Sequence, residues 1–506
     1  MDRAQFLKCG VAGAMGVGAL GMVAGAATAA KADETAYDRE VDVVVVGAGN
    51  GGMSAAAAVA GQGKKVLVLE VSGFIGGGAI WSGGVLHSGN AATFEEYRER
   101  SYNNATNYVK PELERAYIET FVNKYMPWIQ EIGVPVSAVE GAEARWVFGD
   151  NTTDQSTYER AQDYFDALQA YVEDNGGEIL TSTRAIHLIQ DGASVVGVQA
   201  ESVTDGTMMN IKTDNVILAC GGIQANKGLL TQFMGKPAVS SHVMGTPYNT
   251  GSLEAGAQLA GNPTGFSGGY CLACPAGIDE YDAESYEAKR AQGFSFEQSK
   301  SFYTWTNIFS ATGVAGGTDA LYINLNGKRF ADENDDVRNR YSILPQKTLQ
   351  QPDGVVALVM DAETFGEGGL PWDYAVENGC KTVQAEEFAQ GLYDAYGIPK
   401  GAFLREIEAY NEAAENGTAD MLDVPRSLCK RPFKEGPFYA VPMTCNIYYT
   451  FVGVGINENA QVMRLDGRPF ANLYACPPTA GMFGDVYFGG NAVAGTFGYI
   501  AAQHIA

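Results

Sequence analysis

The chain has 506 residues, which is enough for two or three domains. It contains 34 Lys and Arg residues and 59 Asp and Glu residues, which gives a net charge of −25. We therefore expect no basic surface that would bind nucleic acid or anionic lipid. Hydrophobic residues make up 46% and charged residues 18%, a balance that excludes a disordered chain. Glycine is enriched, at 63 residues, which indicates close approaches of the backbone.

Residues 1–34 have the features of an export signal. Arg3 and Lys8 precede an apolar run of small residues, and Ala27-Thr28-Ala29 fits a cleavage site. The start is similar to a twin-arginine signal, with Ala4 in place of the second arginine. A transmembrane anchor is the alternative, but no basic cluster follows the run. We therefore expect a cleaved signal peptide, a periplasmic or cell-surface protein, and a mature chain without a membrane span.

A dinucleotide fingerprint follows the leader. The β-branched run Val41 to Val46 predicts a buried parallel strand, and it leads into a G-x-G-x-x-G turn and a helix over Met53 to Gln62. A second strand, Lys65 to Leu69, ends at Glu70, at the distance expected for a carboxylate that binds a ribose hydroxyl. The predicted cofactor-binding residues in this unit are Gly47, Gly49, Gly51, Gly52 and Glu70.

Two later segments decide which dinucleotide is bound. Glu70 is followed by a G-G-x-x-x-x-S-G-G pattern that ends at Gly84, and a strand from Val216 leads into Ala219-Cys220-Gly221-Gly222. Here the sequence resembles the flavoprotein family that contains soluble fumarate reductases and 3-ketosteroid Δ1-dehydrogenases, with Cys220 in place of a threonine. The resemblance implies that FAD is bound by Gly77, Gly78, Ser82, Gly83, Gly84, Ala219, Gly221, Gly222, Asn491 and Ala492. His87 is not where relatives with covalent flavin carry their histidine, so non-covalent FAD is expected.

The same resemblance implies an α/β fold, with a Rossmann-like FAD-binding domain that is discontinuous in sequence and an inserted α+β capping domain. We expect the FAD-binding domain over residues 41–315 and 447–506, and the capping domain over 316–446. The hydrophobic pattern further predicts a helix over Tyr158 to Asp174, a helix over Leu404 to Glu415, and a sheet meander. The meander strands are Ala185 to Gln190, Val195 to Val203 and Met208 to Lys212.

Catalytic candidates lie in the cap. The segment Ile323 to Glu333 matches a family motif, and in fumarate reductases an arginine shortly after that glutamate donates the proton. Glu333, Arg338 and Tyr341 are therefore candidates, and Arg340 could take the place of Arg338. The alternative is a solvated turn, because acidic residues surround these arginines.

The C-terminal segment concerns the substrate. Fumarate reductases use an H-H-T-M-G-G motif and a later arginine to clamp a dicarboxylate. This chain has Tyr448-Tyr449-Thr450 instead, and Tyr487 where the arginine would fall. By resemblance to ketosteroid dehydrogenases, Tyr487 would hold a ketone oxygen, although it could also be a core tyrosine; Tyr449 is a candidate for proton transfer. The pattern indicates a larger, less charged substrate.

The sequence thus predicts an enzyme that exchanges hydride between FAD N5 and a carbon–carbon bond conjugated to a carbonyl, as an enone or ene reductase or a ketosteroid dehydrogenase. Two alternatives stay open: an unsaturated-carboxylate reductase, and a non-catalytic electron-transfer subunit. Because only one nucleotide fingerprint is present, we expect an external electron donor or acceptor. Cys271 and Cys274 form a lone C-x-x-C that lacks the further ligands of a metal site, so no metal is expected.

Overall fold

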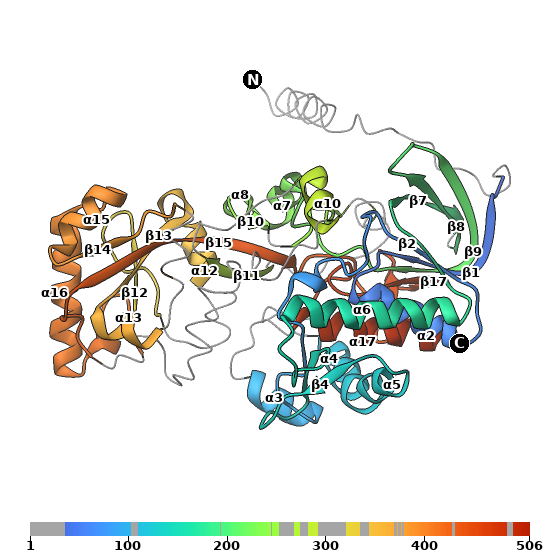
Figure 1. Ribbon diagram of the computed structural model, residues 1–506, viewed down its shortest axis with the longest axis horizontal. Helices are drawn as coiled ribbons and strands as arrows, with labels where there is room; N and C mark the ends of the chain where they lie inside the picture. Colours follow the sequence, from blue (N-terminus) through green and yellow to red (C-terminus); the bar gives the residue numbers. More distant parts are fainter. Residues whose placement is uncertain are drawn as a thin grey trace, which may run out of the picture.

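The computed structural model describes residues 36–102, 110–192, 194–243, 245–251, 253, 268–273, 282–291, 320–333, 344–368, 372, 376, 379–427, 431–482 and 489–506. The described elements form two lobes that lie side by side along the longest axis of the molecule (Figure 1). Leader residues 1–34 and the candidates Arg338, Arg340, Tyr341 and Tyr487 lie outside the described residues.

The larger lobe is built on an eight-stranded sheet. Its strands are β1 (Arg39–Val46), β2 (Val66–Leu69), β6 (Glu178–Leu180), β7 (Thr183–Asp191), β8 (Ser194–Ser202), β9 (Met208–Leu218), β16 (Gln461–Met463) and β17 (Pro469–Ala475). Strands β17, β9, β1, β2 and β6 are neighbours in this order and pair in parallel. Val43 to Val46 of β1 and the whole of β2 are continuous, buried apolar runs, because helices cover this part of the sheet.

Three helices pack together against this sheet: α2 (Asn50–Gly61), α6 (Thr157–Asp174) and the C-terminal α17 (Gly490–Ile505) (Figure 1). Helix α2 contacts both of the others, and nine of its twelve residues are Ala, Gly or Val, so the helices can approach closely. Beyond them lie α3 (Phe94–Tyr102), α4 (Pro111–Thr120), η3 (Phe121–Tyr125), α5 (Met126–Glu131) and a small sheet of β3 (Val85–His87), β4 (Val136–Ala138) and β5 (Arg145–Phe148).

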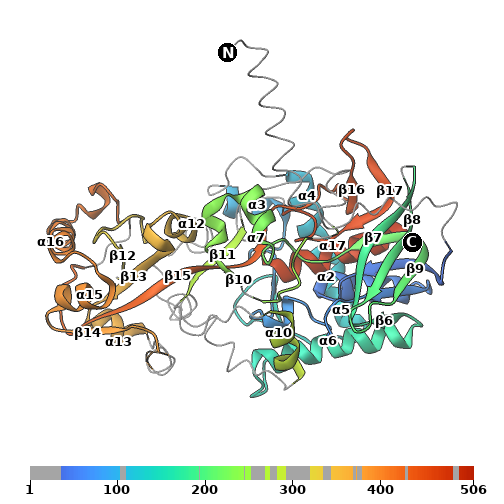
Figure 2. The same ribbon diagram turned by 90° about the horizontal axis from the view of Figure 1, so that it is seen from above.

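The second lobe is built on a six-stranded sheet around β15. Its strands are β10 (His242–Val243), β11 (Gly268–Ala273), β12 (Leu321–Asn324), β13 (Val355–Met360), β14 (Val383–Ala385) and β15 (Phe438–Thr450). The associated helices are α7 (Lys227–Met234), α8 (Lys236–Val239), α12 (Leu344–Leu349), α13 (Ala362–Gly368), α15 (Phe388–Tyr396) and α16 (Lys400–Asn416). Strand β15 runs from the far end of this lobe to the middle of the molecule, as both views show (Figures 1 and 2), so Tyr448 to Thr450 reach the first lobe.

The structure confirms the predicted secondary-structure elements and corrects three of them. The helix predicted from Leu404 begins at Lys400 as α16, with Pro399 as its N-cap. The expected meander is present, but Met208 to Lys212 and the strand from Val216 are one continuous strand, β9, because Thr213 is buried and its hydroxyl is bonded to the backbone. Helix α2 starts at Asn50, before the predicted Met53, since Gly49 already serves as its N-cap. The residue boundaries proposed for the two domains stay predictions. Among the described residues, no helix is long and apolar enough to cross a membrane.

Candidate functional site

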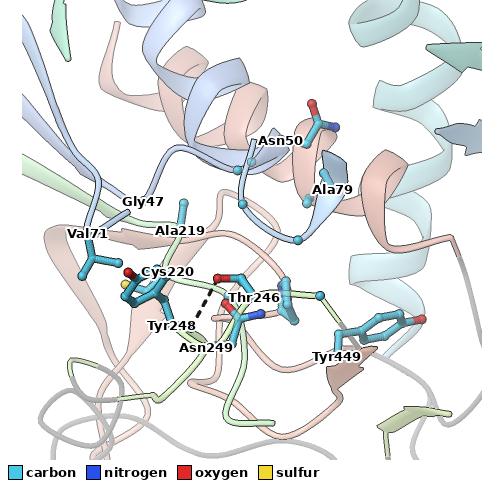
Figure 3. A pocket seen from close by; sticks show the side chains of 18 of the residues that line it. Gly47, Asn50, Val71, Ala79, Ala219, Cys220, Thr246, Tyr248, Asn249 and Tyr449 are labelled. Atoms are coloured by element: carbon cyan, nitrogen blue, oxygen red, sulfur yellow. Dashed lines mark hydrogen bonds between the residues drawn. The ribbon is translucent and has the colours of Figure 1, made fainter. Parts of the chain in front are cut away.

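A cavity of about 510 Å³ opens where the two lobes meet. The turn after β1, the segment around Gly77 to Ser82, the end of β9 and the start of α17 form its walls in the first lobe. Tyr448 and Tyr449, at the end of β15, close it from the second lobe. In Figure 3, Gly47, Ala219 and Cys220 lie on one side of this space and Tyr449 lies at its margin.

The turn between β1 and α2 can be formed only by glycine at its critical points. Gly47 has φ +101°, and a Cβ atom there would collide with the carbonyl oxygen of Ala219. A Cβ at Gly52 would collide with the carbonyl oxygen of Gly47, so this glycine lets helix and turn pack closely. At Gly49, by contrast, a Cβ would meet no protein atom within 4 Å, and this residue borders the cavity. The turn therefore leaves open space at the N-terminus of α2, where no side chain caps the helix and an anion is favoured.

A network of buried hydrogen bonds holds Asn50, the first residue of α2, in place behind the glycine turn. Asn50 Nδ2 donates to the carbonyl oxygen of Asn491 at 2.7 Å, which joins the N-termini of α2 and α17. Asn50 Oδ1 accepts a hydrogen bond from the Tyr164 hydroxyl at 2.9 Å. The Tyr125 hydroxyl is hydrogen-bonded to the hydroxyls of Tyr164, at 3.1 Å, and Ser54, at 2.9 Å. Burial raises the pKa of the Tyr125 hydroxyl, so the network stays neutral.

Glu70 lies at one end of the cavity and is 6% exposed. Its two carboxylate oxygens accept hydrogen bonds from the backbone N–H groups of Ala48, at 2.7 Å, and Ser72, at 2.8 Å. Burial raises the pKa of Glu70 to about 7, an effect that these two N–H groups oppose and that the nearby charge of Glu287 reinforces.

Helix α10 (Ala283–Ala291) is hydrogen-bonded to residues that line the cavity near Glu70. Trp81 Nε1 donates to the Tyr286 hydroxyl at 3.0 Å, and the Tyr248 hydroxyl donates to Glu287 at 2.8 Å. Arg290 donates to the Tyr158 hydroxyl at 2.6 Å and its guanidinium lies over the Trp81 ring. Sequence reasoning missed this helix, because none of its residues belongs to a recognisable motif.

Gln224, Asn249 and Tyr449 form a neutral part of the cavity lining, which we call the Gln224 end, and the Gln224 side chain is 0% exposed. Among the described residues that line the cavity, Arg184 is the only Lys, Arg or His, and it lies next to Thr183, whose N–H donates to the carbonyl oxygen of Glu70. The described walls at the Gln224 end thus present amides and aromatic rings, and no cation.

The structure brings most of the predicted cofactor residues to the cavity. Those that line it are Gly47, Gly49, Gly51, Glu70, Gly77, Gly78, Ser82, Ala219, Gly221 and Asn491. The others, Gly52, Gly83, Gly84, Gly222 and Ala492, are their neighbours in the chain and are not part of the lining. Asn491 Nδ2 also donates to the Ser82 hydroxyl at 2.8 Å, so two distant predicted segments are directly bonded.

Glu333 is placed away from the cavity. It is 4% exposed inside the second lobe, and its carboxylate pairs with Arg329 at 2.5 Å and with Arg426 at 3.4 Å. Arg329 also donates to the carbonyl oxygens of Val424 and Pro425, so the cluster ties the segment after β12 to the segment after α16. Of the predicted C-x-x-C pair, Cys274 lies outside the described residues.

These residues fit FAD. The open Gly49 turn at two helix N-termini suits a pyrophosphate, and the buried Glu70 carboxylate with backbone N–H groups beside it suits a ribose. The cavity volume also lies within the range of cofactor sites.

Fold and site together define a flavin-dependent oxidoreductase. The family model described as an FAD-binding domain matches residues 42–493, and the chain belongs to this family. It is an FAD-dependent oxidoreductase of the class that acts on CH–CH groups.

Two relatives and one solved structure mark the range of similarity. Vinyl phenol reductase of Lactiplantibacillus plantarum is 27% identical, over 88% of this chain and 91% of its own length. NADH:fumarate oxidoreductase of Klebsiella pneumoniae is 22% identical over 93% of this chain, which spans only 48% of that relative. The structure of 3-ketosteroid Δ1-dehydrogenase from Sterolibacterium denitrificans has a TM-score of 0.71 at 17% identity and covers 92% of this chain and 99% of that one.

Proposed function

We propose that this protein reduces a carbon–carbon double bond conjugated to a carbonyl, in a neutral substrate larger than a dicarboxylate. The observation that carries the proposal is the neutral Gln224 end of the cavity. Gln224, Asn249 and Tyr449 line this end, and no described side chain there could pair with a carboxylate. Recognition of a carboxylate normally needs arginine or histidine. The name of vinyl phenol reductase indicates a neutral alkene substrate without a carbonyl, so this relative supports the neutral charge of the substrate and not its carbonyl group.

Reduction of such a bond adds a hydride to one carbon and a proton to the next. FAD, when bound, supplies the hydride chemistry. The chain must hold the carbonyl oxygen with neutral donors and deliver the proton. Tyr449, 7% exposed on the cavity wall, is the described candidate for proton delivery. Tyr487, as holder of the ketone oxygen, and Tyr341, as a second proton donor, are proposed from the sequence alone.

We further propose that residues 1–34 direct export, that the electrons come from an external carrier, and that the lobe around β15 caps the active site. The second fingerprint that NADH would need is absent from the sequence, which supports a separate carrier. An unsaturated-carboxylate reductase is the second candidate. Arg338 and the fumarate-reducing relative favour it.

The test is anaerobic. The purified holoprotein is reduced with a viologen, and the absorbance of its FAD is followed while neutral enones, fumarate or acrylate are added. We expect rapid reoxidation by enones and slow or no reoxidation by the carboxylates. Tyr449→Phe should slow the reaction with enones at least tenfold while FAD content is kept. Reoxidation by carboxylates alone would overturn the proposal, and reoxidation by none of these acceptors would favour an electron-transfer subunit.

A further inference from the structure

The side chain of Asn249 lies in the cavity between two glycine segments that fit FAD. Asn249 is partly exposed and lines the cavity (Figure 3). A Cβ atom at Gly221 would lie 2.2 Å from Asn249 Oδ1, and one at Gly78 would lie 3.9 Å from its Nδ2. The carboxamide therefore packs directly on Gly221, which leaves room for it because glycine has no side chain.

Hydrogen bonds hold the backbone on both sides of this carboxamide. The carbonyl oxygen of Asn249 accepts from the N–H of Ala225 at 2.9 Å, and that of Thr250 accepts from Asn226 Nδ2 at 3.0 Å. The N–H of Thr250 donates to the carbonyl oxygen of Tyr248 at 2.8 Å. Within the part of the chain that the structure describes, no residue is hydrogen-bonded to the Asn249 side chain. Its carboxamide can therefore offer a ligand both an acceptor and donors from a fixed position.

The surroundings of Asn249 indicate which half of FAD it meets. A Cβ atom at Gly77 would lie 3.1 Å from the Cα atom of Gly49, so Gly77 packs on the turn that suits the pyrophosphate. Asn249 lies beside Gly78, the next residue in the chain. Because Glu70 suits the ribose of the adenosine half, the flavin half must lie on the other side of the pyrophosphate, in the neutral part of the cavity that Asn249 lines.

We propose that Asn249 is a cofactor-binding residue, whose carboxamide is hydrogen-bonded to the flavin half of FAD, either at the polar edge of the ring or at a ribityl hydroxyl. Both groups present donors and acceptors that a carboxamide can match. A carboxamide also adds no charge beside a ring whose reduced form can be anionic. The inference concerns the cofactor, so it does not depend on which substrate the enzyme reduces.

Two variants of Asn249 test the contact. Asn249→Ala removes the carboxamide, and titration of the stripped protein should show FAD binding about tenfold weaker, as the loss of one hydrogen bond predicts. Its affinity for ADP should stay within about twofold of the wild type, because ADP lacks the flavin half. Asn249→Asp keeps the shape and adds a negative charge, so contact with the ring should lower the midpoint potential of the bound FAD. A tenfold change in the relative affinity for oxidised and reduced FAD corresponds to about 30 mV.

Asn151→Asp is the control, because it adds the same charge at an exposed position that does not line the cavity, and it should change neither quantity. A lower potential in Asn249→Asp would place the contact at the ring. Weaker FAD binding by Asn249→Ala without a shift of potential in Asn249→Asp would place it at the ribityl chain. Unchanged FAD affinity in Asn249→Ala would overturn the inference. Equal losses of FAD and ADP affinity would overturn it as well, since the effect would then not be specific to the flavin half.

Discussion

The two ends of the cavity are built in different ways. At the Glu70 end, backbone shape and one buried carboxyl group define the site: a glycine turn without room for a Cβ at Gly47 or Gly52, the N-terminus of α2, and the N–H groups of Ala48 and Ser72 around the carboxylate. At the Gln224 end, side chains from separate elements define it, and the described ones are neutral. At the Glu70 end, few substitutions are therefore compatible with the backbone geometry. At the Gln224 end, single substitutions can change which substrate is bound.

The difference teaches which part of the site determines cofactor and which determines substrate. A dinucleotide presents the same phosphates and ribose in every relative, so its site can depend on backbone geometry. Substrates differ among relatives, and the side chains that meet them differ too. The predictions below test whether this division holds, in order of decreasing effect.

Gly47→Ala should abolish cofactor binding. Its Cβ would collide with the carbonyl oxygen of Ala219, at a backbone φ of +101°. We expect the FAD content per protein, read from the absorbance of the purified protein, to fall at least tenfold. Gly63→Ala is the matched control, because Gly63 also has positive φ, at +77°, but open space around it. Full FAD content in Gly47→Ala would show that the turn is not shaped for the cofactor.

Glu333→Gln should destabilise the second lobe without loss of FAD. The change leaves Arg329 and Arg426 buried without their carboxylate, which costs on the order of 3–5 kcal/mol. Thermal unfolding measures the effect. Glu415→Gln, at an exposed ion pair with Lys434, should cost well under about 1 kcal/mol. A Glu333→Gln protein of normal stability that has lost turnover would instead support a direct role of Glu333 in catalysis.

Glu70 should make the stability of the FAD-free protein depend on pH. Its pKa, raised to about 7 by burial, means that the folded state keeps a proton that the unfolded chain releases above its ordinary pKa of 4.5. The resulting contribution to the free energy of unfolding is fully present below pH 4.5 and is lost as pH rises through 7. The difference in melting temperature between Glu70→Gln and wild type should therefore increase, in favour of the variant, from pH 5 to pH 8. A difference that is constant over this range would contradict the assignment.

Tyr125→Phe should have the smallest effect. It removes the hydroxyl that joins Ser54 and Tyr164 beneath the turn, which costs on the order of 1–2 kcal/mol and should weaken FAD binding several-fold. Urea titration and FAD titration of the stripped protein measure the two effects. Tyr393→Phe, at a position 51% exposed, should change neither.

The sequence predicted the Glu70 end of the cavity much better than the Gln224 end. Gly47, Gly49 and Glu70 lie within one strand–turn–helix–strand unit, so their local order determines their geometry. Gln224 and Tyr448 meet only because β15 crosses between the lobes, and no local pattern reveals that contact. Glu333 matched a family motif, but its partner Arg426 lies on a distant segment, and only the fold reveals that they pair.

The most direct test of the account is a single-turnover comparison of benzalacetone and cinnamate, which share a skeleton but differ in charge. The viologen-reduced holoprotein is mixed with each compound, and the concentration dependence of FAD reoxidation gives an affinity and a limiting rate. We predict saturable reoxidation by benzalacetone, and a Kd for cinnamate at least tenfold weaker, because no described side chain at the Gln224 end can pair with its carboxylate. Tighter binding and faster reoxidation by cinnamate would contradict the claim that this end selects neutral substrates.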